Sequence, residues 1–250
     1  MTRRRWIADT YAPVDGHPTT AALTGDQALH LARVLRAQPG QIFDVVAHGF
    51  LHRAEVTTVS ESEVRFTLHE ELEADAALPL HLLLAVFKFD HLEWAIEKAT
   101  ELGVAAITPI LARRTEKHLA QAAAKRAERW RRIALEASKQ SRRTDVPTIH
   151  EPAPLRSALV GLDATPLRIL LSETEQTTPL AAALHGALQA NTTDEVPATA
   201  LAIGPEGGWT AEEMGLFTTH AWQHVTLGPR ILRAETAAIA AIAITAAQLL

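Results

Sequence analysis

Two hydrophobic patterns divide the chain. From residue 80 onward, continuous apolar runs alternate with segments whose apolar residues recur every three or four positions. The first pattern is typical of strands buried in a parallel sheet, and the second of amphipathic helices. They predict strands at 80–87, 105–110, 167–173, 199–204 and 224–228. They predict helices at 90–102, 117–142, 180–190, 210–221 and 234–250. This alternation indicates an α/β domain with a mostly parallel sheet covered by helices.

In the first 70 residues the apolar positions recur at a shorter interval along the chain. Polar and apolar residues alternate in 41–49, 50–59 and 63–71, which predicts three strands. The residues between 27 and 37 have helical spacing, and Thr24 and Gln27 are placed as a capping box. An acidic linker is expected around residues 70–78. We therefore expect two domains, a small β domain at 1–72 and an α/β domain at 73–250.

Helix caps are also predicted in the second domain. Asp90 and Glu93 are spaced as the cap and third residue of the helix at 90–102, and Gly103 ends that helix. Pro179 is placed in the first turn of the helix that follows it.

Composition excludes several classes of protein. The chain has no cysteine, so disulfides and cysteine metal sites are ruled out. The first thirty residues lack the apolar core of a signal peptide. The C-terminal run 236–250 is alanine-rich and short for a membrane span, so a buried helix is expected. The twelve histidines have no metal-site spacing. These features predict a cytoplasmic protein with no metal and no membrane partner.

The charge is unevenly distributed. The formal net charge is −5, but eleven Lys or Arg and only three acidic residues lie between Arg113 and Arg143. A basic face on an acidic protein is typical of a site for a polyanion. A solvated helix face explains the same charges equally well.

Two Gly-Pro corners stand near the C-terminus. Residues 204–208 read GPEGG, and residues 227–238 read LGPRILRAETAA. Each follows a predicted strand, and ligands of open parallel sheets bind beyond the carboxyl ends of the strands. Glycines let the backbone approach a ligand closely. Neither corner is a phosphate loop or a GxGxxG motif. A nucleoside-like cofactor is one interpretation, and a pair of tight connections is the other.

Three motifs in this order resemble one family. FKFDHLEWAIEKATELGV, IGPEGGWTAEE and LGPRILRAETAA are similar to the RsmE family. Those proteins are SPOUT methyltransferases that methylate N3 of a uridine in 16S ribosomal RNA. The resemblance covers nearly the whole chain, because RRRW and HLARVLRAQPGQ are similar to the family's PUA-like RNA-binding domain.

The resemblance implies a fold, a cofactor and partners. It implies a SPOUT α/β domain with a C-terminal trefoil knot, preceded by a small PUA-like β-barrel. It implies S-adenosylmethionine bent within the knot, a homodimer, and a uridine in the decoding region near the 3′ end of 16S ribosomal RNA. The assembled small subunit is the expected substrate.

The resemblance, the chemistry of uracil methylation and the basic charge together suggest roles for individual positions. The catalytic candidates are Arg233, which would stabilise or position the uracil, and Glu206 and Glu235, which would accept its proton or orient the arginine. The cofactor candidates come from three loops: Leu171, Ser172, Gly204, Gly207, Gly208, Leu227, Gly228, Ile231, Leu232 and Thr236. The RNA-binding candidates are basic: Arg4, Arg5, Lys88, Arg113, Arg114, Arg142 and Arg143.

Some alternatives stay open at this point. Phe89 stands where the family usually has glycine, and Arg113 where an acid is common. Each candidate glutamate is equally explained as a cap or an ion pair. A SPOUT methyltransferase for another RNA site, or a catalytically silent RNA-binding assembly factor, would carry the same motifs.

Overall fold

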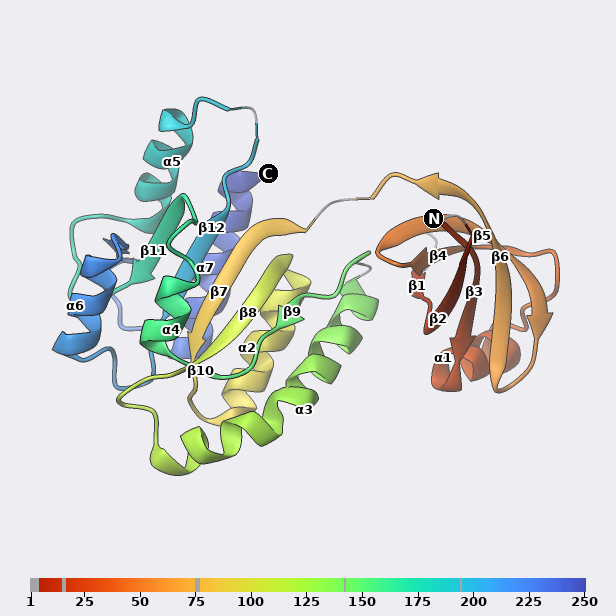
Figure 1. Cartoon of the computed structure of the whole chain (residues 1–250), viewed down its shortest axis with the longest axis horizontal. Helices are drawn as coiled ribbons and strands as arrows, with labels where there is room; N and C mark the ends of the chain where they lie inside the picture. Colours follow the sequence, from red (N-terminus) through yellow and green to blue (C-terminus); the bar gives the residue numbers. More distant parts are fainter. Residues whose placement is uncertain (1–4, 15–16, 75–76, 142, 194) are drawn as a thin grey trace. The chain divides into compact units, whose positions relative to one another are not determined.

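The chain forms two compact units (Figure 1). The computed structural model describes residues 5–14, 17–74, 77–141, 143–193 and 195–250. The first unit comprises residues 1–76 with 138–145, and the second comprises 77–137 with 146–250. The domain limits expected from the sequence stay a prediction at the level of single residues.

The described residues of the first unit form a sheet of six strands in the order β1-β4-β5-β6-β3-β2. Their bounds are Arg5–Ile7, Thr10–Val14, His17–Thr24, Ile42–Ala47, Phe50–Val59 and Glu63–Leu72 for β1 to β6. Among the described strands of this unit, only β1 and β4 pair in parallel. The edge strands β1 and β2 are joined by two residues, Ala8 and Asp9. This short connection brings one end of each edge strand together, so the sheet curls into a half-barrel with Trp6, Leu31 and Phe66 in its core.

The helix of this unit differs from its prediction. It begins as α1 (Gly25–Leu29) and continues as a π-helical turn, η1 (His30–Val34). The predicted capping box is wrong, because the Thr24 hydroxyl donates to Asp9 Oδ2 (3.1 Å) and makes no cap hydrogen bond. Gln27 Nε2 donates instead to the Ile7 carbonyl (3.1 Å). Both side chains thus fasten the helix to the β1–β2 connection.

The second unit contains a fully parallel sheet. Its main path has the order β10-β8-β7-β12-β11-β13, with β9 paired to β8. The bounds are Leu78–Ala85, Val104–Leu111, Thr148–Ile149, Ala153–Pro154, Leu167–Leu171, Thr199–Ile203 and Gln223–Val225 for β7 to β13. All five predicted strands are confirmed. The two-residue strands β9 and β10 carry no pattern and were not predicted.

In the part of the chain that the structure describes, six helices cover the two faces of this sheet (Figure 1). Their bounds are Phe89–Glu101, Lys117–Ser141, Leu155–Val160, Leu180–Ala190, Ala211–Thr219 and Ala234–Leu249 for α2 to α7. One core cluster joins the sheet to α2, α3, α5 and α7, with Trp130 as its largest fully buried side chain. The other face packs on α4 and α6. The short helix α4 was not predicted.

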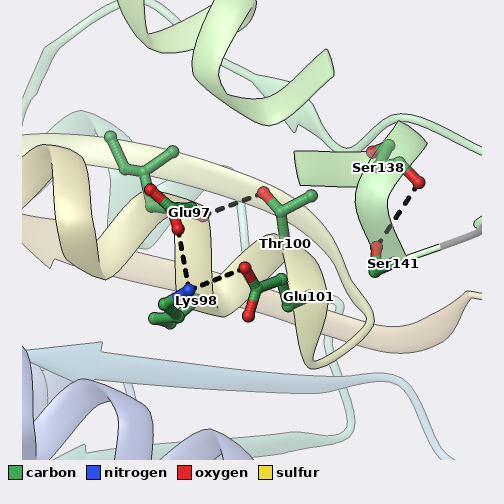
Figure 2. A network of polar contacts seen from close by, with 7 residues as sticks. Glu97, Lys98, Thr100, Glu101, Ser138 and Ser141 are labelled. Carbon is green, nitrogen blue, oxygen red and sulfur yellow. Dashed lines mark hydrogen bonds and ion pairs between the residues drawn. The ribbon is translucent and has the colours of Figure 1, made fainter. Parts of the chain in front are cut away.

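The ends of two helices test the predicted caps. Lys88, and not Asp90, is the N-cap of α2, so that prediction is wrong. Glu93 accepts from Arg126 and Arg129 of α3 instead (3.4 and 2.8 Å). The C-terminal end of α2 is as expected, with Gly103 at φ 95° and Lys98 bonded to Glu97 and Glu101 (both 2.7 Å; Figure 2).

The C-terminal run forms α7, and its buried residues include Ala238, Ala241 and Ile242, as expected for a core helix. None of the described helices is long and apolar enough to cross a membrane. Ahead of α7, the chain after β13 is hydrogen-bonded to the start of α5. Thr226 N–H donates to Thr178 O (2.9 Å), and Leu180 N–H donates to Thr226 O (3.0 Å). This proximity is what the expected trefoil knot requires, and the knot itself stays a prediction.

Candidate active site

A cavity of about 1210 Å³ lies beyond the carboxyl ends of four neighbouring strands. Its wall includes Lys88 after β7, Ser172 after β11, Gly204 after β12 and Leu227 after β13. This is the edge of a parallel sheet at which ligands bind. The loops after β11, β12 and β13, from which the cofactor candidates come, line one cavity within the second unit.

The loop after β12 is held in a conformation that needs glycine. Gly208 has φ 70°, a value at which other residues are strained. The Gly207 carbonyl accepts a hydrogen bond from the Arg114 guanidinium. Trp209 follows at once and lines the cavity. The hydrogen bond from Arg114 therefore holds the backbone of this loop, and Trp209 places the end of the loop at the cavity.

The loop after β13 leaves much of its backbone open. Thr226 Oγ1 accepts from Gly228 N–H (3.1 Å) and donates to the Gly228 carbonyl (3.2 Å). The other backbone groups between Leu227 and Leu232 form no hydrogen bond within the described chain. Ile231 is 85 % exposed although it is apolar. This loop therefore offers free polar backbone and an apolar side chain to a flat ligand.

The loop after β11 is a stiff turn. Ser172 N–H donates to the Val225 carbonyl (3.0 Å), which anchors the loop to β13. The hydroxyl of Thr177 and the N–H groups of Thr177 and Thr178 donate to Glu175 Oε1 (2.6, 2.7 and 2.9 Å). These hydrogen bonds, the hydroxyl first, lower the pKa of Glu175 to about 2. Glu175 is therefore an acceptor that holds the turn.

A buried glutamate joins two of the loops. Glu213 Oε1 accepts from Arg113 N–H in the loop after β8 (2.8 Å). Its Oε2 accepts from the N–H and hydroxyl of Thr210 (2.9 and 3.0 Å), which completes a capping box on α6. Arg114, which follows Arg113 in the chain, donates a hydrogen bond to the Gly207 carbonyl. Two hydrogen bonds thus tie the loop after β8 to the segment that follows β12.

Charged groups of both signs line the cavity. The positive or proton-accepting groups are Lys88, His91, Arg114, Arg230 and Arg233. The carboxylates are Glu173, Glu175 and Glu206. No group of three or more metal-ligating side chains lies within the described residues.

Glu235 is buried beside this wall. It is 4 % exposed and lies in the first turn of α7. Its Oε1 accepts from His91 Nδ1 of α2 (2.8 Å), and His91 itself lines the cavity. The candidate glutamates therefore occupy different environments, since Glu206 is exposed at the cavity edge.

The structure brings most of the predicted site residues to the cavity. Those that line it are Leu171, Ser172, Gly204, Glu206, Gly208, Leu227, Gly228, Ile231, Leu232 and Arg233. Three candidates are not among the lining residues within the described chain: Gly207, Glu235 and Thr236. Gly207 and Glu235 each bond to a residue that does line it. Their roles in binding and catalysis stay predictions.

The basic candidates fall into separate groups. Lys88 and Arg114 line the cavity, and Arg113 is exposed 3.9 Å from Glu212. Arg143 belongs to the first unit, and its Nε donates to Asp145 (3.2 Å). Arg5 lies in β1. Arg4 and Arg142 lie outside the described residues.

Sequence reasoning did not single out every residue of the wall within the described chain. Glu173, Trp209 and Met214 line the cavity through positions next to predicted motifs, so a wider window around each corner would have found them. His91 is different, because its partner Glu235 is 144 residues away and no local signal joins them.

Comparisons with known proteins agree with this geometry. A family model for an RNA methyltransferase domain matches residues 74–246, and a model for an RNA methyltransferase PUA domain matches 23–68. A ribosomal RNA small subunit methyltransferase E from Synechocystis is 34% identical over 93% of this chain and 74% of its own. The protein of that name from Bacillus subtilis is 32% identical, over 96% and 94%.

Solved structures give the same result. A ribosomal RNA small subunit methyltransferase E from Neisseria gonorrhoeae, bound to S-adenosyl methionine, has a TM-score of 0.77 and 29% identity over 97% of this chain and 96% of its own. A putative methyltransferase from Legionella pneumophila, in complex with the same cofactor, has a TM-score of 0.76 and 28% identity over 99% and 98%.

Fold, cavity and matches define the class of the molecule, an RNA methyltransferase with a SPOUT α/β domain and an N-terminal PUA domain. The fold class expected from the sequence is thereby confirmed. The relatives narrow the assignment from this class of protein to one family. The chain belongs to the ribosomal RNA small subunit methyltransferase E family, the RsmE family of the sequence resemblance.

Proposed function

We propose that the protein uses S-adenosylmethionine to methylate N3 of a uridine in the decoding region near the 3′ end of 16S ribosomal RNA, in the assembled small subunit. The observation that carries the proposal is the single cavity formed by the loops after β11, β12 and β13. Relatives named for small-subunit ribosomal RNA, at 32–34% identity over almost the whole chain, support the substrate.

The residues of the cavity fit this cofactor. The open backbone of Leu227–Leu232 and the exposed Ile231 suit an adenine ring. The carboxylates of Glu173 and Glu206 suit the positively charged sulfonium and ammonium groups. Small-ligand sites typically measure roughly 300–1,000 Å³. The volume of about 1210 Å³ therefore leaves room for a base beside the cofactor. When bound, S-adenosylmethionine supplies an electrophilic methyl group.

The protein must make uracil N3 reactive. This nitrogen carries a proton and is a poor nucleophile, so the proton has to leave and the resulting anion has to be stabilised. Arg233 lines the cavity at the N-cap of α7 and is the residue we assign to the negative charge on the uracil. Orientation of the base in a closed site supplies the remainder of the rate enhancement.

The basic residues give the RNA its route. Lys88, Arg113 and Arg114 lie at or beside the cavity in the second unit, and we assign them to the RNA backbone. Such contacts make affinity fall steeply as salt is raised. We also propose a homodimer and, because the substrate is ribosomal, a cytoplasmic location.

Ribosomal RNA from cells with and without the gene tests the function. Loss of one N3-methyluridine, located by primer extension and mass analysis of nucleosides, is the expected result. Loss of a different modification would assign the protein to another RNA site. Unchanged RNA would leave only an assembly role. Stabilisation of the pure protein by S-adenosylmethionine tests cofactor binding separately.

A further inference from the structure

A histidine and a buried carboxylate form a pair at the cavity wall that no motif predicts. His91 comes from the first turn of α2, and Glu235 from the first turn of α7. Their atoms Nδ1 and Oε1 are 2.8 Å apart. The histidine side chain is 31% exposed and the glutamate side chain 5%. The pair thus has one end open to the cavity and the other closed.

The hydrogen bond fixes which ring nitrogen carries the proton. A carboxylate only accepts, so His91 Nδ1–H is the donor, and the neutral ring keeps its lone pair on Nε2. The nearest carboxylate to Nε2 is Asp90 Oδ2 at 3.6 Å, which is too long for a hydrogen bond. Nε2 is therefore able to accept a proton from a ligand in the cavity.

The surrounding charges suit a ring that gains a proton. Glu235 Oε2 is buried and has no hydrogen-bond partner among the described residues, so the negative charge beside the ring is not offset there. Asp90 adds a second carboxylate on the same helix. Among the described residues, the cations that share the wall are Lys88, Arg114, Arg230 and Arg233. A buried carboxylate that holds an imidazole and stabilises its protonated form is the arrangement of hydrolase triads.

We propose that His91 is the proton acceptor of the reaction and that Glu235 is its positioning residue. This inference rests on the proposed function. The N3–H bond of uridine breaks and its proton goes to His91 Nε2. The electron pair left on N3 forms the bond to the methyl carbon, and the electron pair of the old carbon–sulfur bond stays on sulfur. His91 then returns the proton to solvent through the open side of the cavity.

The first experiment compares His91→Gln with the wild type in single-turnover methylation of small subunits from cells that lack the gene. General-base catalysis contributes about 10²–10⁴-fold, so the variant should be at least about 100-fold slower at neutral pH. Its residual rate should rise with pH toward the wild-type rate, because hydroxide removes the N3 proton when no side chain does. A variant with the wild-type rate and pH profile overturns the proposal.

A second histidine–carboxylate pair provides the matched control. His220 Nδ1 lies 2.7 Å from Asp163 Oδ1, and neither residue lines the cavity. His220→Gln removes the same chemistry away from the site, so its methylation rate and pH profile should equal those of the wild type. Equal slowing of both variants would show a loss of folded protein and would overturn the assignment to His91.

Two readouts do not depend on turnover. Nitrogen-15 spectra of histidine-labelled wild-type protein above neutral pH should show His91 with its proton on Nδ1. Glu235→Ala should lose this preference, whereas Glu235→Gln should keep it, because the amide oxygen still accepts from Nδ1–H. Methylation should follow the same order. A wild-type ring with its proton on Nε2 contradicts the proposal, since that nitrogen could accept nothing.

The affinity for S-adenosylmethionine distinguishes failure of this inference from failure of the proposed function on which it rests. His91→Gln should bind S-adenosylmethionine within about threefold of the wild type by calorimetry. If the wild type binds the cofactor but methylates no uridine N3, the proposed function fails. If the wild type methylates N3 and His91→Gln does so equally well, only the role of His91 fails.

Discussion

Gly204, the first residue of the loop after β12, has no room for a side chain. A methyl group placed there would lie 3.1 Å from Trp209 Nε1 and 3.3 Å from its Cδ1. The indole cannot move aside easily, because it packs edge-on against Phe217 (5.0 Å between ring centroids), which is fully buried. Overpacking of this kind costs about 1–3 kcal/mol. Gly204→Ala should therefore lower the unfolding free energy of the second unit by about 2 kcal/mol.

The assay is thermal unfolding with and without S-adenosylmethionine. A loss of about 2 kcal/mol corresponds to about 4–8 °C for a domain of this size. Affinity should fall as well, about tenfold for each 1.4 kcal/mol, because Gly204 and Trp209 both line the cavity. The control is Gly215→Ala in α6, where an added methyl meets nothing within 4 Å and should raise stability by about 0.5–1 kcal/mol. Equal midpoints and equal affinities for Gly204→Ala and the wild type would refute the steric argument.

Three further predictions concern other parts of the second unit. Glu213→Ala removes the cap of α6 and the acceptor of Arg113 N–H, so urea unfolding should show a loss of about 2–4 kcal/mol, and a loss below 1 would contradict this. Burial, with nearby His150, lowers the pKa of His81 to about 4. As the pH falls, the unfolded chain therefore takes up this proton at a higher pH than the folded protein does. The unfolding free energy should fall by up to about 3 kcal/mol as the pH is lowered from about 6.5 to about 4. An unchanged pH dependence in His81→Gln would refute this origin. Trp130→Ala should cost about 3–5 kcal/mol, since the ring is fully buried, and a midpoint within 2 °C of the wild type would contradict the packing.

Much of the fold follows from local pattern. The parallel strands of the second unit are nearly continuous apolar runs, so their positions could be predicted to within a few residues. The capping box of α6 is also local, because Thr210 and Glu213 need only their own turn. Thr24 has the same spacing, but its hydroxyl donates to Asp9, which a different part of the chain supplies. Tertiary contacts therefore decide which capping pattern is used.

The site was predictable to the extent that its loops carry motifs. Gly204 and Gly228 lie in the two Gly-Pro corners that the sequence shows, and both line the cavity. The pairing of His91 with Glu235 depends on α2 and α7 lying side by side in the core, which neither helix encodes alone. The resemblance to a family pointed to Glu235 as a candidate, but it did not predict that Glu235 is hydrogen-bonded to His91.

The most direct test of the account is methyl transfer with purified components. The protein, S-adenosylmethionine and small ribosomal subunits from cells that lack the gene are incubated, and the digested 16S ribosomal RNA is examined by mass spectrometry. The account predicts N3-methyluridine at a single position, at close to one per subunit. No N3-methyluridine, in a reaction where the protein demonstrably binds the cofactor, would contradict it.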